Sequence, residues 1–284
     1  MSEATPQALV QDAQALLKRA AQNIFQESEQ SQHDAIFAVF LIRQKVLVII
    51  ESFPVWNNTI DELYNDCTER DIGYFSCMVY ELAVAGDTKS VLDILSRYQS
   101  IVNALEQYLS RSSAEKVSFR WLTSDSEEGI RAYEDATEDK MKKDIIEFRM
   151  DIAAINSQLK NWDTLWLAEK RKVVIEAMKI REALHQIFGC IHEDADMADA
   201  DLQIMLGDFN NAFLESMSDL PVMVEEVESE DGNCAQIECF VGFLSAAAQR
   251  IQDFFQKGDY SVFEGLSYFD DFWVLEDLED SEEE

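Results

Sequence analysis

The sequence predicts an all-α protein built as a multi-helix bundle, and three observations carry that prediction. Only nine Gly and three Pro occur in 284 residues, too few for the many tight turns of a sheet protein of this length. Apolar residues recur at alternating spacings of three and four along most of the chain. Between Gly129 and Gly189, no Gly or Pro occurs for 59 residues. We therefore expect helices joined by short loops.

Two helices open the chain. Thr5 followed by Pro6 is typical of an N-cap with proline in the first turn, and we expect this helix to reach about Glu29. The next segment, about His33 to Phe53, is apolar nearly all round and is stopped by Pro54. A helix that is apolar on every side belongs inside a bundle.

Three further helical segments complete a predicted N-terminal bundle, residues 1–125. Two lie between Ile60 and Leu82, and Thr88 can cap the third. The apolar stripe of that third helix is Val91, Leu95, Tyr98, Val102, Leu105 and Leu109. Lys116 to Leu122 alternates like a strand, but a lone strand has no partner in a helical chain, so we interpret it as part of a connection.

Residues 126–192 are predicted to form a long helix or a helical hairpin, over about 130–191. A seam with a heptad period runs through Met141, Ile145, Phe148, Ile152, Ile155, Leu159, Trp162 and Trp166. The seam resumes at Val173 with its phase shifted. We favour a break near Asn161 to Thr164, with Asp163 as a cap. A homodimeric coiled coil through the Met141 to Ile191 seam is the alternative, because a single long helix needs a partner along its length.

Residues 193–284 are predicted to form an acidic helical C-terminal region with a short disordered tail. They carry 26 of the 56 acidic residues but only two bases, Arg250 and Lys257. Helical stripes persist from Leu202 to Phe213 and from Ile237 to Phe254, whereas we interpret Val222 to Asn233 as an acidic turn region with a short strand as the alternative. Much of the charge should therefore stand on fixed helix surfaces.

Composition excludes several classes of protein. A hydrophobic fraction of 47% with 17 Phe is too high for a disordered acidic chain. The most apolar segment, Ala35 to Ile50, contains charged residues and is too short to span a bilayer. The beginning of the chain carries no secretory signal pattern, and five cysteines without paired spacing favour reduced thiols, so we expect a cytoplasmic protein. The acidic region disfavours direct binding to nucleic acid or to anionic membranes.

Three patterns contain residue types found in metal or catalytic sites. The acids from Asp194 to Asp201 do not match a calcium loop, because glycine and the final glutamate are missing at the required positions. His185, Cys190, His192 and Glu193 include zinc-ligand types but have no second pair elsewhere. The acidic row around Glu134 to Glu147 is interspersed with lysines and resembles a solvated helix face. We predict no catalytic residue, no metal ligand and no cofactor, and hence a protein that is not an enzyme.

The C-terminal segment is the predicted binding site, with aromatic residues that pack and carboxylates that remain outside. The candidate residues are Phe269, Asp270, Asp271, Phe272, Trp273, Glu276, Asp277, Glu279 and Asp280. This pattern favours a non-enzymatic protein whose acidic surface occupies a basic surface of a protein partner, as a DNA mimic or inhibitor would. An acidic chaperone or assembly scaffold for a basic client is the first alternative, and an all-α metal-dependent nucleotide hydrolase is the second.

Overall fold

The computed structural model describes residues 5–26, 28–53, 58–65, 67, 75, 78–82, 86–110, 133, 136–195, 199–229 and 233–272. Every regular element within these residues is helical, which confirms the all-α prediction. The segment Lys116 to Leu122 lies outside them. Among the described helices, none combines the length and the apolar character that crossing a membrane requires.

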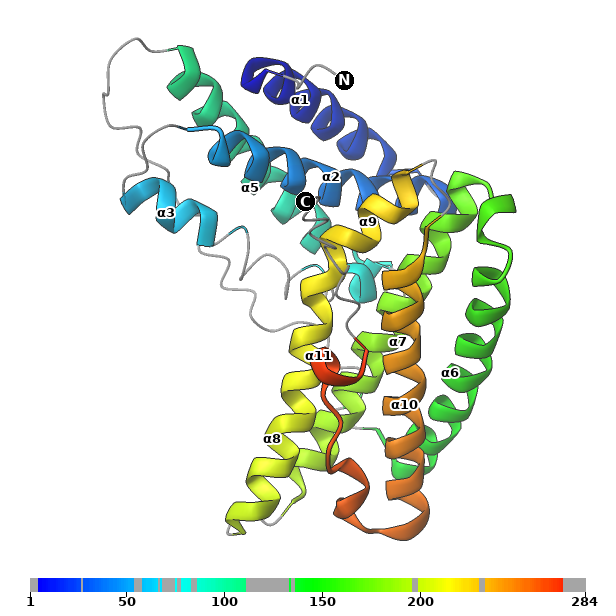
Figure 1. Ribbon diagram of the computed structural model, residues 1–284. Helices are drawn as coiled ribbons and strands as arrows, with labels where there is room; N and C mark the ends of the chain where they lie inside the picture. The colour runs from blue at the N-terminus through cyan, green and yellow to red at the C-terminus, as the bar shows by residue number, and fades with distance from the viewer. Residues whose placement is uncertain are drawn as a thin grey trace, which may run out of the picture.

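The N-terminal layer consists of α1 (Pro6–Asn23), α2 (Glu29–Glu51), α3 (Asn58–Asn65) and α5 (Lys89–Ser110). In it, α1 packs along α2 and α5, and α2 also contacts α3 and α5 (Figure 1). The predicted start of α1 is confirmed, because the side chain of Thr5 accepts a hydrogen bond from the backbone N–H of Ala8 at 3.3 Å.

The predicted boundary between the first two helices is wrong. Helix α1 ends at Asn23, and α2 begins at Glu29. The physical reason is Ser28, whose hydroxyl accepts a hydrogen bond from the N–H of Ser31 at 3.1 Å and so caps α2. The prediction that α2 is buried on most sides is confirmed by the buried residues of its middle, Ala35, Ile36, Phe37, Ala38, Val39, Phe40, Ile42, Val46, Ile49 and Ile50.

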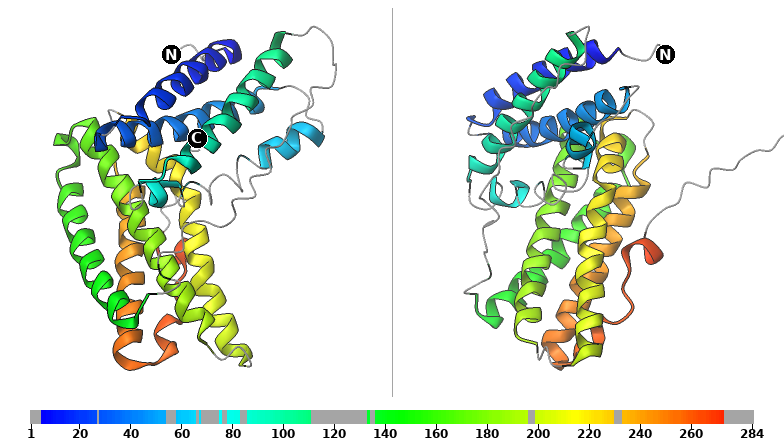
Figure 2. Two further views of the ribbon diagram at one scale, coloured as in Figure 1. Left: turned by 180° about the vertical axis from the view of Figure 1, so that it is seen from behind. Right: turned by 90° about the vertical axis from the view of Figure 1, so that its left-hand side faces the viewer.

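The rest of the chain forms a bundle in which α6 (Glu138–Leu159), α7 (Leu167–Glu193), α8 (Ala200–Glu215) and α10 (Ala235–Lys257) run beside one another. Helix α10 packs on α6 and α7, and α7 also contacts α8. Figure 2 shows the N-terminal layer lying across one end of this bundle. Helix α7 and the short α9 (Leu220–Glu228) make the contact with α2 there.

The 126–192 region contains a break, and α6 and α7 form a hairpin joined through the 3₁₀ turn η3 (Trp162–Thr164). Asp163 does not cap α7. The carboxylate of Glu169 instead accepts a hydrogen bond from the N–H of Trp166 at 2.8 Å. The seam residues buried within this one chain are Ile145, Ile152, Ile155, Leu159 and Trp162, whereas Trp166, the last seam position, is exposed. The homodimer stays a prediction.

The interpretation of Val222 to Asn233 as a turn or strand is wrong over its first part, because α9 is helical as far as Glu228. Pro221 stands in the first turn of α9, where its missing N–H costs no helical hydrogen bond. Glu226 is buried and accepts hydrogen bonds from the N–H groups of Gln236 and Ile237 at 2.9 and 3.0 Å. Burial, partly offset by these bonds, raises the pKa of Glu226. One acid of the supposed turn therefore caps α10 from inside the protein.

Candidate functional site: an acidic groove

A groove of about 720 Å³ lies between α8 and the chain from Gly258 to Gly265, which contains the 3₁₀ turn η5 (Tyr260–Phe263). The elements whose residues line it, the start of α8 and the turn after α10, stand at the end of the bundle away from the N-terminal layer (Figure 1). The acidic residues lining this acidic groove are Asp199, Asp201, Asp208, Asp259 and Glu264. Among the described residues that line it, there is no Lys, Arg or His.

Helix α8 positions three of these carboxylates. Asp199 is its N-cap and accepts hydrogen bonds from the N–H groups of Asp201 and Leu202 at 3.0 and 3.2 Å. Carboxylates are favourable at this positive end of a helix. Asp201 and Asp208 are exposed and stand seven residues apart, so they share one side of the helix.

The opposite wall depends on backbone geometry and on one arginine. Gly258 ends α10 with φ 66°, in the left-handed region that favours glycine. Asp259 caps η5, and its hydrogen bond from the Ser261 N–H lowers the pKa of Asp259. Arg250 donates from Nη1 to the carbonyl oxygens of Val262 at 2.8 Å and Glu264 at 2.5 Å. The carboxylates of this wall are thus held on an ordered turn.

Both bases of the C-terminal third are engaged outside the acidic groove. Arg250 binds the backbone of the groove wall, and Lys257 forms an ion pair with Asp253 at 3.5 Å. The carboxylates of Asp201, Asp208 and Glu264 therefore face the solvent-accessible groove with no base among its lining residues. A concave surface of one charge sign concentrates counter-ions and cationic ligands.

The acidic groove also has apolar lining, from Leu202, Ile204, Met205 and Tyr260. Leu202 and Met205 pack against the core, and the Tyr260 ring lies 4.8 Å from that of Phe254. Ile204, by contrast, is 63% exposed. An exposed large apolar side chain framed by carboxylates suits a ligand with both cationic and apolar groups.

The groove carboxylates are too dispersed to hold one metal ion together. Glu29, His33 and Glu176 do gather in this way within the described part of the chain. Their ligand atoms all lie within 4.8 Å of one another. Those residues lie between α2 and α7, away from the acidic groove. Metal–oxygen bonds of about 2.0 to 2.6 Å require closely gathered ligands. The acidic groove instead matches several separate positive charges.

The predicted C-terminal site is placed only in part. Phe269 is 42% exposed, and Phe272 packs against Phe243 with 6.0 Å between ring centroids. Asp271 is exposed and accepts a hydrogen bond from the Ser267 N–H at 3.1 Å. Asp270 belongs to the backbone of the four-residue helix α11 (Tyr268–Asp271). The other predicted site residues lie outside the described residues: Trp273, Glu276, Asp277, Glu279 and Asp280.

Tyr268 joins this C-terminal segment to the bundle. Its buried hydroxyl donates to the carboxylate of Asp219, which is only 2% exposed and also accepts a hydrogen bond from Gln236 Nε2 at 2.5 Å. Burial and the adjacent Asp219 charge raise the pKa of Tyr268. Since α11 also contacts α8, this network fixes the chain that follows the groove wall.

The zinc-like pattern is not brought together. His185 Nε2 hydrogen-bonds to Asn210 Oδ1 at 2.9 Å and stacks on Phe213, and burial lowers the pKa of His185 to about 4. Cys190 Sγ donates to the carbonyl oxygen of Tyr133 at 3.4 Å. The described cysteines carry no disulfide: Cys67, Cys190, Cys234 and Cys239.

The acidic row of α6 forms local ion pairs, as its mixed charges predict. Lys142 pairs with Glu138 at 2.5 Å, and Lys143 pairs with Glu147 at 3.4 Å. Each pair is four residues apart on the helix and exposed to solvent. Glu134 lies outside the described residues.

Sequence reasoning missed the acidic groove because its two walls are about 50 residues apart in the chain. The available signals were the acids around Asp199 and the Gly258 to Gly265 turn, but nothing in the sequence shows that they face each other. Comparison of the chain with protein-family models, with curated proteins and with solved structures gives no match.

Proposed function

We propose that this protein binds a basic protein partner through the acidic groove, without catalysing a reaction. The observation that carries the proposal is the lining of the groove, in which five carboxylates and no base surround an exposed Ile204. This geometry supports an occupant that presents several Lys or Arg side chains around an apolar residue.

Several weak charge pairs acting together give such a surface its binding energy. An exposed ion pair contributes roughly 0.2 to 1 kcal/mol, so three or four new pairs amount to about 0.6 to 4 kcal/mol. Long-range attraction by the whole acidic region adds mainly to the association rate, and salt weakens both effects. The proposal therefore requires binding that is markedly salt-dependent.

The partner surface is one that ordinarily meets phosphates, so the protein acts as a DNA mimic or inhibitor. Support comes from the fixed placement of Asp201 and Asp208 on one helix side, since rigid carboxylates imitate regularly spaced phosphates better than a mobile tail does. The residues Phe269 to Glu284 add nine more acids to the C-terminal region. An acidic chaperone would instead bind basic clients with little selectivity among them.

The test is fluorescence anisotropy with a labelled peptide of alternating Arg and Leu, at two salt concentrations. We expect the triple variant Asp201→Asn, Asp208→Asn, Glu264→Gln to bind about ten-fold more weakly or worse. The matched control neutralises three exposed acids elsewhere, Asp93→Asn, Glu106→Gln and Asp139→Asn, and so has the same net charge. Equal losses in both variants would show that only net charge matters and would contradict the proposal.

A truncation separates the groove from the C-terminal tail. Removing Phe269 to Glu284 should lower the affinity for the same peptide, because it removes part of the acidic surface. In the truncated chain, the groove triple variant should lower the affinity further. If truncation abolished binding and the groove variant had no effect in the full chain, the tail alone would be the site.

Two finer expectations accompany this proposal. A cytoplasmic location fits the absence of a disulfide among the described cysteines, since a reducing compartment keeps thiols reduced. A homodimer through the Met141 to Ile191 seam would need apolar surface left exposed on α6, and Ile146 and Met150 supply some of it. Mass measurement in solution tests the dimer: a monomer at every concentration would contradict it.

A further inference from the structure

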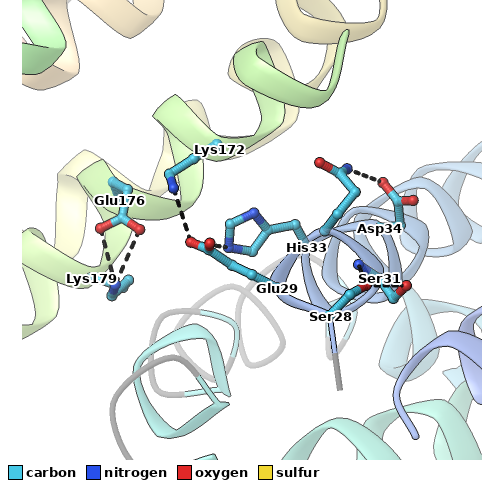
Figure 3. A network of polar contacts seen from close by, with 9 residues as sticks. Ser28, Glu29, Ser31, His33, Asp34, Lys172, Glu176 and Lys179 are labelled. Carbon is cyan, nitrogen blue, oxygen red and sulfur yellow. Dashed lines mark hydrogen bonds and ion pairs between the residues drawn. The ribbon is translucent and has the colours of Figure 1, made fainter. Parts of the chain in front are cut away.

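A histidine and two glutamates meet where the N-terminal layer contacts the bundle (Figure 3). Glu29 and His33 come from α2, and Glu176 comes from α7. One ligand atom from each lies within 4.8 Å of the other two, and Nε2 of His33 is 3.8 Å from Oε1 of Glu29. These residues are separate from the acidic groove and from its proposed function.

His33 is the buried member of this cluster. It is only 6% exposed, and its Nε2 faces the carboxylate of Glu29 from beyond hydrogen-bonding distance. Among the hydrogen bonds of the described residues, none involves its side chain. Its Nε2 pairs with the Glu29 carboxylate only over this long 3.8 Å contact, and a metal ion would replace the contact with a direct bond.

The helix geometry suits a metal ion. Residues four apart lie on the same side of a helix, so Glu29 and His33 form a pair of donors on α2, and Glu176 approaches from α7. A tetrahedral zinc ion with bonds of about 2.0 to 2.2 Å places its donors roughly 3.3 to 3.6 Å apart. Each glutamate side chain has three rotatable bonds, so rotation can bring its oxygens from within 4.8 Å to that spacing.

Two lysines now balance the glutamate charges. Lys172 Nζ is 3.0 Å from Oε1 of Glu29, and Lys179 Nζ is 3.0 and 3.1 Å from the two carboxylate oxygens of Glu176. Both ammonium groups have access to solvent, so each can move into water when another cation binds the carboxylates. They are therefore direct competitors of a metal ion, and removing one of them should raise the affinity for the metal.

We propose that Glu29, His33 and Glu176 bind one zinc ion, which displaces Lys172 and Lys179 and ties α2 to α7. One imidazole and two carboxylates are a mixed nitrogen and oxygen set that zinc accepts, with water in the fourth position. Bound zinc would stabilise the junction between the N-terminal layer and the bundle, because it binds the folded arrangement of two helices that are far apart in the sequence.

The first experiment uses the three histidines of the chain as reporters. The full chain is stripped with a chelator, kept reduced and titrated with ZnCl₂, and the imidazole resonances are followed by NMR. They are assigned by substituting each histidine in turn. We expect the His33 resonance to shift at one equivalent while those of His185 and His192 stay in place. An unchanged His33 resonance, or a shift confined to His192, would overturn the proposal.

The second experiment measures zinc affinity by competition with a chromophoric chelator. His33→Gln and Glu176→Gln should each weaken binding at least ten-fold, whereas His192→Gln is the control and should leave it unchanged. Lys172→Gln should strengthen binding, because it removes a competitor for Glu29. Weaker binding in Lys172→Gln, or no loss in His33→Gln, would contradict the site.

A third measurement distinguishes this site from a cysteine site, and a folding check accompanies it. Cobalt replaces zinc, and the near-ultraviolet spectrum of the complex should lack thiolate-to-metal charge-transfer absorption, since the proposed ligands contain no sulfur. Such absorption would place the metal on cysteine and overturn the proposal. Each variant is checked by circular dichroism. If His33→Gln is unfolded, the exposed Glu29→Gln takes its place and should lower the affinity similarly.

Discussion

Nη1 of Arg250 donates a hydrogen bond to the backbone carbonyl oxygen of Glu264 at 2.5 Å. The same nitrogen also donates to the carbonyl oxygen of Val262 at 2.8 Å. The main base near the acidic groove thus stabilises its wall through the backbone, while the carboxylate of Glu264 lines the groove. In this arrangement a positive residue helps to keep a negative surface in shape.

Arg250→Met should weaken binding of the basic peptide even though it makes the protein more negative. A hydrogen bond from a charged donor contributes roughly 1.5 to 3 kcal/mol at most. Losing two such bonds loosens the turn that carries Glu264. We expect a several-fold loss of affinity by anisotropy and faster amide exchange over 258–265. Tighter binding with unchanged exchange would mean that net charge, and not the shape of the wall, governs association.

Tyr268→Phe should destabilise the protein by about 1 to 3 kcal/mol, because it leaves the buried carboxylate of Asp219 with one donor fewer. Urea unfolding measures this change in the free energy of unfolding. Tyr260→Phe is the matched control, since the Tyr260 hydroxyl makes no hydrogen bond to other described residues. Equal effects of the two substitutions would rule out a special role for the contact between Tyr268 and Asp219.

His185 should make the protein less stable in mild acid. Burial, followed by the positive charge of Arg181, lowers the pKa of His185 from its usual 6.5 to about 4. Between these values the unfolded chain binds a proton that the folded protein excludes. The contribution of neutral His185 to the free energy of unfolding is therefore complete above pH 6.5. It is lost as the pH falls toward 4, with a total on the order of 3 kcal/mol.

The measurement is urea unfolding of wild type and His185→Gln from pH 4.5 to 7.5. Glutamine keeps a donor for Asn210 but does not titrate in this range. Because many carboxylates also titrate in this pH range, the relevant quantity is the difference in the free energy of unfolding between wild type and variant. The wild type should lose stability relative to the variant as the pH falls, and parallel curves would contradict the assignment. His192→Gln serves as the control for removal of an imidazole.

Much of the fold could be predicted because the helical stripes are read from local spacing. The predicted break between α6 and α7 is confirmed, but the N-cap of α7 is Trp166, whose N–H donates to the carboxylate of Glu169. Which nearby polar side chain makes such a contact depends on backbone geometry. The sequence did not predict helix α9, because its acidic residues interrupt the apolar pattern of the segment. The buried residues of this helix include Met223 and Val227, and the helix packs against α2 and α7.

The candidate sites were harder to predict than the helices, because both depend on long-range contacts. The acidic composition of the C-terminal region drew attention to it, but the sequence pointed to its last residues and not to the groove. Glu29 and Lys172 are 143 residues apart, yet their side chains are 3.0 Å apart. Helical periodicity predicts which side of each helix is buried but not which helix it meets.

Zero-length cross-linking tests the central claim most directly. A carbodiimide joins a carboxylate to a lysine amine only where the two are in contact, and mass spectrometry then locates the linkage. With a Lys and Leu peptide at low salt, we predict linkages concentrated at Asp201, Asp208 and Glu264 that disappear at high salt. Linkages spread evenly over the exposed acids, or concentrated on α1 and α5, would contradict the acidic groove as the binding site.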